Sequence, residues 1–490
     1  MKTKYAAVFD AGTTALKGAM VDDSGRIIAS ASENLDLLID GDEREQDPDQ
    51  WWQAFRNVSR SMLEQAADAS GDFGFDASHI AGIICSGQMQ DVIALDADLN
   101  PVRNAILYSD GRAEEQASRL ASALEGGERE FLDIVGNRLE GCLPLPKLMW
   151  LRDHDPEVFG HIRHVLISSK DYLIARLTGV CVGDVAACST AGAMDIREGR
   201  WDAELCAAAG LDRTLLPELH APQDRIGAVT PEASERTGFA VGTPVYAGIG
   251  DAGATTLASG VSRPGQYNIN IGTSGWIATI SPEPFTDKPG AANLAFGVGP
   301  GFVNAVPFLN AGDVHQWATH VFAGADYEKA HELVEGSVPG SHGVLCLPYL
   351  VGERFPVMNP DIRGAYVGLS PDTTSADMMR AALEGVAFSI REGMGSFDVA
   401  PVSISLIGGG ARESAWCQIL ADVLDHPVEV FANAEVLPAV ALASLVFGDV
   451  DLVHAIREST TYAPDAVATR TYETVYRRFL TLYPALRTLM

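Results

Sequence analysis

One carboxylate near the middle of the 490-residue chain has neighbours that would let it act as a base. Asp251 follows an apolar run at 245–247 and two glycines, Gly248 and Gly250, and small residues come after it. A strand that breaks at glycines before a helix presents its turn at the carboxyl edge of a sheet, where open α/β proteins bind ligands. A carboxylate at that edge can accept a proton from a hydroxyl group. The alternative is a helix N-cap, because Asp is a preferred residue there.

Two similar turns, one in each half of the chain, could bind phosphate groups. Each lies between two predicted strands, within residues 5–21 in the first case and 266–280 in the second. Their residues are Gly12, Thr13 and Thr14 in the first turn and Gly272, Thr273 and Ser274 in the second. The repeated strand–turn–strand pattern predicts a duplicated fold. Two such turns facing each other could hold a polyphosphate through backbone N–H groups.

Asp10 stands two residues before the first of these turns. An acidic side chain beside a phosphate-binding turn is chemically reasonable when a divalent cation lies between them. Asp10 is therefore a candidate for holding Mg²⁺, through water. The alternative is an Asp that only stabilises the turn.

Other patterns narrow the class of ligand. Three glycines at 408–410 open a predicted helix and would let a flat ligand approach the backbone. This run lacks the G-x-G-x-x-G spacing of a dinucleotide site and the order of elements is wrong for one, which argues against a dehydrogenase. No G-x-x-x-x-G-K-[ST] motif is present, which excludes the common phosphate loop. Polar side chains at predicted strand ends suit a polyhydroxylated ligand, and they are Gln88, Gln90, Asp91, Asp110 and Arg112.

The composition describes the protein that must position these residues. A net charge of −30 argues against nucleic acid and anionic membranes as partners. No apolar run approaches the length of a membrane span. Seven scattered cysteines without C-x-x-C pairs indicate a reduced, cytoplasmic protein without a zinc site.

The expected elements form two α/β domains, with a boundary near 240–248 that divides the chain into 1–245 and 246–490. The N-terminal part should contain a β-meander over 5–30, a strand at 80–86, and helices at 48–67, 147–151 and 169–177. The C-terminal part should contain helices at 375–391 and 413–424 and a strand at 406–410.

With these pieces placed, nearly the whole chain resembles the FGGY family of carbohydrate kinases. One family signature fits at every position, from Gly364-Ala365-Tyr366-Val367-Gly368-Leu369 through Asp377-Met378 to Ala381-Ala382-Leu383-Glu384. A second fits from Pro144 through Lys147 and Trp150 to His154, and departs only at Cys142. The resemblance implies two ribonuclease-H-like, actin-like ATPase domains with a cleft between them. The first would bind the sugar and the second the nucleotide.

The resemblance also implies roles for single residues. Asp251 matches the catalytic base, and Asp10 matches the acidic residue that works with the metal and the substrate. ATP would contact Gly12, Thr13, Thr14, Gly272, Thr273, Gly312, Gln316, Gly409, Gly410, Ala411 and Ser414. The substrate would contact Gln88, Met89, Gln90, Asp110 and Asp251.

The implied reaction is phosphorylation of a small sugar or polyol by ATP and Mg²⁺, with a ketopentose such as D-xylulose as the expected substrate. Relatives that act on xylulose read G-Q-M-H-G where this chain has Gly87-Gln88-Met89-Gln90-Asp91. Ribulose, gluconate, glycerol and erythritol stay open as alternatives, as does an actin-fold ATPase or sugar sensor without phosphate transfer. The sequence does not determine the oligomeric state, for which a homodimer is the working expectation.

Overall fold

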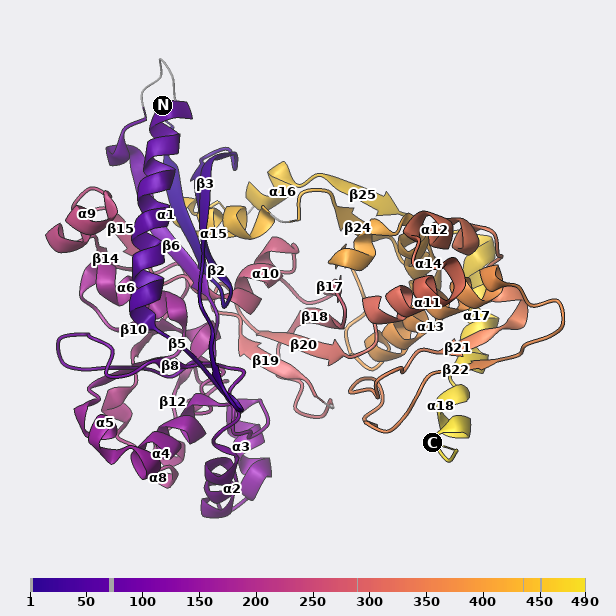
Figure 1. Cartoon of the computed structure of the whole chain (residues 1–490), viewed down its shortest axis with the longest axis horizontal. Helices are drawn as coiled ribbons and strands as arrows, with labels where there is room; N and C mark the ends of the chain where they lie inside the picture. The colour runs from indigo at the N-terminus through magenta and orange to yellow at the C-terminus, as the bar shows by residue number, and fades with distance from the viewer. Residues whose placement is uncertain (1–2, 70–74, 289, 435, 450–451, 490) are drawn as a thin grey trace.

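The computed structural model describes residues 3–69, 75–288, 290–434, 436–449 and 452–489. The chain forms two lobes, each built around a seven-stranded sheet with helices packed against it (Figure 1). In Figure 1 the N-terminal lobe runs from indigo to magenta, and most of the C-terminal lobe is orange to yellow. This architecture agrees with the predicted pair of α/β domains.

The N-terminal sheet begins with the predicted meander, formed by β1 (Tyr5–Ala11), β2 (Ala15–Asp22) and β3 (Ile27–Asn34). β6 (Ile80–Gly87) then pairs with β1 in parallel. β1 is buried on both faces because it lies inside the sheet, which explains its nearly continuous apolar sequence. The strand order is β14-β15-β6-β1-β2-β3, with β16 also beside β6.

The C-terminal sheet repeats this arrangement. β17 (Gln266–Ile271) and β18 (Gly275–Ser281) form an antiparallel hairpin, and β23 (Ser403–Ile407) pairs with β17 in parallel. The strand order is β19-β20-β18-β17-β23-β24-β25. The predicted duplication is therefore confirmed at the level of the sheets. The predicted strand at 406–410 ends earlier, because Gly408 has a φ of 93° and turns the chain.

Helices cover the two sheets as the apolar spacing predicts. α1 (Pro48–Ala69) packs on β2 and β3, and its Trp51, Trp52 and Phe55 side chains are buried in the core cluster of this lobe. α6 (Ser169–Thr178) packs against β1 and β6. In the C-terminal lobe, α13 (Ser375–Met394) lies at the centre of the main core cluster.

Two segments of the C-terminal half reach the N-terminal lobe. α15 (Leu437–Phe447) packs against β1 and β6, and in Figure 1 it lies beside that sheet. β19 (Ala292–Ala295) contributes Ala295 to a core cluster that is otherwise built mainly from the N-terminal lobe. The lobes are therefore packed together at several places along the chain.

The change from one sheet to the other falls close to the predicted boundary. β15 (Pro244–Tyr246) and β16 (Ile249–Gly250) both pair with β6, and α10 (Asp251–Ala258) follows them directly. The second sheet starts at β17. The division at 245 and 246 stays a prediction, while the strand pairing places residues 244–250 in the first sheet.

The other elements are short. In the N-terminal lobe they are β4 (Leu38–Asp40), β5 (Glu43–Gln46), β7 (Ile93–Leu95), β8 (Ala105–Ile106), α2 (Glu114–Ala123), α3 (Gly127–Val135), α4 (Pro144–His154), α5 (Pro156–His161), β9 (His164–Leu166), β10 (Val182–Asp184), α7 (Val185–Cys188), β11 (Met194–Asp195), β12 (Arg200–Trp201), α8 (Ala203–Ala208), β13 (Glu218–His220), β14 (Arg225–Ala228) and α9 (Pro231–Thr237). Later in the chain they are β20 (Phe302–Phe308), α11 (Gly312–Ala323), α12 (Tyr327–Glu335), β21 (Leu345–Leu347), β22 (Ala365–Val367), α14 (Ser414–Leu424), β24 (Val428–Phe431), α16 (Leu452–Ile456), β25 (Ser459–Tyr462), α17 (Ala466–Phe479) and α18 (Leu482–Leu486). Among the described helices, none combines the length and apolar character that a bilayer crossing requires.

Candidate active site

Asp251 is the first residue of α10, immediately after β16. Its carboxylate Oδ1 accepts a hydrogen bond from the Ala252 N–H at 2.7 Å, and Oδ2 accepts none from the described residues. The N-cap of α10 is Gly250, so the alternative interpretation of Asp251 as the N-cap is wrong. One carboxylate oxygen is thus free to meet a ligand.

The surroundings of Asp251 favour proton transfer. Its side chain is open to solvent, yet protein atoms surround the carboxyl group on most sides. This desolvation raises the pKa of Asp251 to about 6; the Ala252 N–H opposes the rise and the negative charge of Asp10 adds to it. A general base works best when its pKa lies near the working pH.

Asp10 and Asp251 lie at the same edge of the N-terminal sheet. Strands β1, β6 and β16 are parallel, and Asp10, Gln88 and Asp251 stand at or just after their carboxyl ends. The Ser86 hydroxyl donates to Asp10 Oδ1 at 2.8 Å. The sheet edge predicted from the glycine pattern is therefore the place where these residues meet.

The first phosphate turn is tied to the loop after β6. The Thr13 hydroxyl donates to Gln88 Oε1 at 2.7 Å, and the Gln88 amide donates to Gln46 Oε1 at 2.9 Å. Gln46 in turn donates to the Thr13 carbonyl at 2.8 Å. Because the Gln88 side chain is 1% exposed and both its amide atoms are engaged, it orders the turn in this structure. Its contact with a substrate stays a prediction.

Met89 and Gln90 continue this loop toward the second lobe. Met89 packs on a small apolar cluster that includes Leu294 and Phe296. Gly250 allows its close approach, since a Cβ there would lie 2.0 Å from the Met89 sulfur. Gln90 has a φ of 64°, and its carboxamide makes no hydrogen bond to a described residue. The Gln90 side chain is thus available to a ligand.

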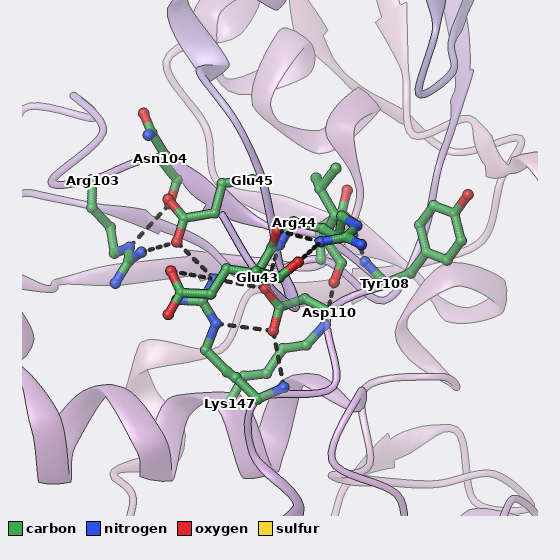
Figure 2. Close-up of polar contacts among 12 residues, drawn as sticks. Glu43, Arg44, Glu45, Arg103, Asn104, Tyr108, Asp110 and Lys147 are labelled. Carbon is green, nitrogen blue, oxygen red and sulfur yellow. Dashed lines mark hydrogen bonds and ion pairs between the residues drawn. The ribbon is translucent and has the colours of Figure 1, made fainter. Parts of the chain in front are cut away.

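Asp110 is held in an ionic network (Figure 2). Its Oδ2 accepts from the Arg44 N–H at 2.7 Å, and Arg112 Nε donates to its Oδ1 at 2.9 Å. Arg112 also pairs with Glu45 at 2.9 Å and lies over the Trp150 ring. Burial alone would raise the pKa of Asp110, but its hydrogen bonds from Arg112 and Arg44 hold it below the usual value. Asp110 therefore joins β5 to the 108–112 loop, and its predicted contact with the substrate remains untested.

Lys147, a residue of the second signature, hydrogen-bonds to the 88–90 loop and to the residue before the 108–112 loop. Its side chain is fully buried and Nζ donates to the carbonyls of Gln90 at 3.2 Å and Leu107 at 2.6 Å. Burial lowers the pKa of Lys147 to about 8, and the Asp91 carboxylate opposes that shift. Burial also raises the pKa of Asp91, whose Oδ1 accepts from the Tyr108 N–H at 3.1 Å. Lys147 thus links both loops of the predicted sugar side.

A cavity of about 870 Å³ opens in the C-terminal lobe. It is lined by Gly272, Thr273, Gly312, His315, Gln316, Tyr327, Glu328, His331, Glu332, Gly409, Gly410, Arg412, Glu413 and Ser414. In its wall, a Cβ at Gly312 would lie 2.3 Å from the Gly272 carbonyl, so glycine is required there. The cavity is large enough for a nucleotide-sized ligand.

Most of the predicted nucleotide residues meet at this cavity. Ala411 does not line it and packs against the lobe's core instead. The turn at 12–14 is also outside its wall, because that turn belongs to the other lobe. The expected grip of two facing turns on one polyphosphate stays a prediction.

Sequence motifs did not identify the polar wall of the cavity, which α12 and the start of α14 contribute. Tyr327, His331 and Glu413 belong to this wall, and His331 Nδ1 lies 2.7 Å from Glu413 Oε1. The side-chain hydrogen bond to Glu413 raises the pKa of His331 above its usual value. A polar face at helical spacing was the available signal, but most surface helices have one. No group of three or more potential metal-ligating side chains occurs within the described ranges.

Two family models cover most of the chain. The N-terminal domain of the FGGY family of carbohydrate kinases matches residues 5–258, and the C-terminal domain matches 267–444. The chain is 30% identical to the xylulose kinase of Bacillus subtilis, over 98% of this chain and 97% of that protein. It is 28% identical to the gluconokinase of the same organism, over 98% and 96%.

A solved structure gives the same result in three dimensions. The xylulose kinase from Rhodospirillum rubrum superposes with a TM-score of 0.88 at 30% identity, covering 99% of both chains. The predicted resemblance and the predicted fold class are thus confirmed. The chain belongs to the FGGY family of carbohydrate kinases and is an enzyme that transfers a phosphoryl group to a sugar.

Proposed function

We propose that the protein phosphorylates a ketopentose, with D-xylulose as the first candidate, and that Asp251 is the general base. The observation that carries this proposal is the free carboxylate oxygen of Asp251 at the shared edge of β1, β6 and β16. Its pKa of about 6 supports the role, because the group is mostly ionised at neutral pH and can still hold a proton transiently.

The chemistry follows from this placement. A sugar hydroxyl held near Gln90 and Asp251 gives its proton to the carboxylate as its oxygen attacks the γ-phosphorus of ATP. The bond from that phosphorus to the bridging oxygen breaks, and ADP leaves. Backbone N–H groups of the turns at 12–14 and 272–274 orient the phosphates, while Gly409, Gly410 and Ser414 contact the nucleoside. Catalysis of this kind depends mainly on positioning and charge stabilisation.

Asp10 is the proposed anchor for Mg²⁺. Its Oδ1 is engaged by Ser86, and its Oδ2 accepts no hydrogen bond from a described residue. One carboxylate beside a phosphate turn fits an ion that protein sites usually bind through one or two carboxylates, waters and substrate phosphates. When bound, Mg²⁺ would neutralise charge on the β- and γ-phosphates.

The relatives support a sugar or sugar acid as the acceptor. Xylulose kinases match at 30% identity and a gluconokinase matches at 28%, so gluconate is the second candidate. This chain has Gln90 and Asp91 where xylulose-specific relatives carry His and Gly, which changes donors and bulk beside Asp251. The assignment of sugar binding to 1–245 and nucleotide binding to 246–490, and the homodimer, are part of this proposal.

The test is ADP release from Mg-ATP with D-xylulose, L-xylulose, D-ribulose, L-ribulose, gluconate, glycerol, erythritol and D-arabitol. Strong stimulation by one ketopentose is the expected result. Stimulation by gluconate alone would assign the second candidate. A flat panel with slow basal hydrolysis would reject both acceptors.

A further inference from the structure

The start of α6 touches three functional segments at once. Ser168, its N-cap, and the next two residues, Ser169 and Lys170, are fully buried. Each of the three side chains donates a hydrogen bond to a backbone carbonyl in a different segment. The distances are 2.7 Å from Ser168 Oγ to Gln88 O, 2.7 Å from Ser169 Oγ to Ala11 O, and 3.0 Å from Lys170 Nζ to Ala247 O.

These three carbonyls belong to the segments that carry the proposed chemistry. Ala11 stands between Asp10 and the first phosphate turn, and Gln88 opens the loop of Met89 and Gln90. Ala247 opens the turn that ends at Asp251. Each bonded carbonyl lies at the end of a strand or one residue beyond it. The strands are β1, which ends at Ala11, β6, which ends at Gly87, and β15, which ends at Tyr246. The Ala11 and Gln88 carbonyls each also accept a backbone hydrogen bond, from the Gln88 N–H at 3.1 Å and from the Ser169 N–H at 3.3 Å. A buried side-chain donor added at each strand end helps to fix the direction in which the chain continues.

The Lys170 ammonium is itself held on two further sides. It lies 2.5 Å from Asp171 Oδ1 and 2.8 Å from Asp184 Oδ2, and all three side chains are fully buried. Asp184 also caps α7 through the N–H groups of Ala186 and Ala187. Burial opposes the charge on Lys170, but Asp171 and Asp184 hold its pKa above the ordinary value. A buried cation with three oxygen partners has little freedom to move, and its ion pairs place it at one point.

We propose that Ser168, Ser169 and Lys170 form a positioning tripod that sets the mutual placement of the 88–90 loop, Asp10 and Asp251. The tripod touches no reacting atom and acts through three backbone carbonyls. Its catalytic consequence rests on the proposed roles of Asp10 and Asp251. The structural part, that one helix start locks three separate loops, does not depend on those roles.

The tripod predicts a different kinetic effect for each of its members. Ser168→Ala frees the 88–90 loop and should raise the KM for the sugar about 10-fold with kcat little changed. Ser169→Ala loosens the segment after Asp10 and should lower kcat about 10-fold with little change in sugar KM. Lys170→Met frees the Asp251 turn and should lower kcat about 100-fold. Ser168→Thr restores both hydroxyl and cap, so it should return the sugar KM to within about 2-fold of the parent value.

The matched control is Ser59→Ala. The Ser59 hydroxyl is also fully buried in the N-terminal lobe and donates to a backbone carbonyl, that of Phe55 at 2.6 Å, within α1. It therefore loses a comparable hydrogen bond far from the three loops in sequence, and its kcat and KM should stay within about 2-fold of the parent values. If the three tripod variants behave like Ser59→Ala, or all show one common loss of kcat and KM, the tripod is rejected.

Hydrogen exchange of the full-length protein separates this proposal from the proposed function. Ser168→Ala should speed amide exchange at 88–91, Ser169→Ala at 11–14, and Lys170→Met at 247–252, each without a general increase over the sheet. This outcome would support the tripod even if no sugar in the panel were phosphorylated. Unchanged exchange at all three loops, or an equal increase throughout the lobe in each variant, would overturn it. Lys170→Arg serves if Lys170→Met does not fold, and should then show the smaller local increase at 247–252.

Discussion

The two lobes share one framework and fill it differently. Asp10 precedes the turn of the first hairpin, and Asn270 occupies the same place before the turn at 272–274. In both lobes this position also pairs with a parallel strand, with Ser86 in the first and Ile407 in the second. Duplication thus supplied two similar scaffolds, but only the N-terminal copy carries a carboxylate at this point. The two carboxylates proposed for catalysis, Asp10 and Asp251, both lie at the edge of the N-terminal sheet.

The edges of the two scaffolds also differ in how they present groups to a ligand. The C-terminal lobe offers an open cavity of about 870 Å³, lined by glycines such as Gly272 and Gly312 together with polar and charged side chains. In the N-terminal lobe, Gln88 and Asp110 are 1% and 0% exposed, and the polar atoms of their side chains hydrogen-bond to protein groups. The candidate site of the first lobe is therefore ordered by networks of side-chain hydrogen bonds, while that of the second lobe is an open cavity. Nucleotide binding and sugar binding should accordingly respond to different kinds of mutation.

The largest effect is expected at the only carboxylate assigned to proton transfer. Asp251→Asn keeps the shape but removes the base, and kcat should fall by about 100- to 10,000-fold. ATP affinity, measured by calorimetry, should be unchanged because the cavity proposed for the nucleotide lies in the other lobe. Near-normal turnover would show that Asp251, at the sheet edge of the first lobe, is not the general base.

Asp10→Asn and Asn270→Asp test the asymmetry between the lobes. Removing the Asp10 charge should lower kcat about 100-fold and raise the Mg²⁺ concentration needed for half-maximal rate. Asn270→Asp in that background should restore nothing, because the second scaffold faces the nucleotide cavity. Rescue by the second substitution would mean that the two scaffolds are functionally equivalent.

Crowding the cavity should affect the nucleotide alone. A Cβ at Gly312 would lie 2.3 Å from the Gly272 carbonyl, so Gly312→Ala must displace one of the two backbones. The KM for ATP should rise about 10- to 100-fold, with the sugar KM nearly constant. Gly160→Ala is the control, because a Cβ there meets no atom within 4 Å. An equal rise in both KM values would contradict separate sites.

Breaking the Asp110 network should have the opposite selectivity. Asp110→Asn weakens the bonds to Arg112 and Arg44, and the sugar KM should rise about 10-fold with the KM for ATP unchanged. Because its pKa is lowered in the folded state, the ionised carboxylate stabilises the fold above the unfolded pKa. The stability difference between parent and variant, measured by urea unfolding, should therefore shrink as the pH falls below about 4. A constant difference down to pH 2.5 would argue against this role.

A further prediction is a pH dependence of the parent enzyme, which needs no substitution to observe. The reaction needs ionised Asp251, whose pKa is raised to about 6. The rate constant kcat/KM should be flat above that pH and fall about 10-fold per pH unit below it. In Asp251→Asn the residual rate should lose this inflection. An unchanged inflection in the variant would assign the titration to another group.

Local patterns predicted one half of this site better than the other. Glycine turns indicate backbone shape, so Gly272 and Gly410 were recognisable from local pattern, whereas Gly312 came only from the family resemblance. The burial of Gln88 and Asp110 depends on partners 42 and 66 residues away, at Gln46 and Arg44, and no local pattern encodes such pairings. The tripod was not predicted from the sequence for the same reason, since Ser169 and Ala11 are 158 residues apart. Hydrogen bonds between residues far apart in the sequence can be identified only once the fold is known.

The most direct test of phosphoryl transfer at Asp251 is the stoichiometry of one reaction. ADP, inorganic phosphate and phosphosugar would be quantified together, with D-xylulose or whichever acceptor gives the strongest stimulation, for the parent protein and Asp251→Asn. We expect one phosphosugar for each ADP in the parent, almost no inorganic phosphate, and loss of phosphosugar in the variant. ADP matched by inorganic phosphate in the parent, at a rate that Asp251→Asn leaves unchanged, would contradict this expectation.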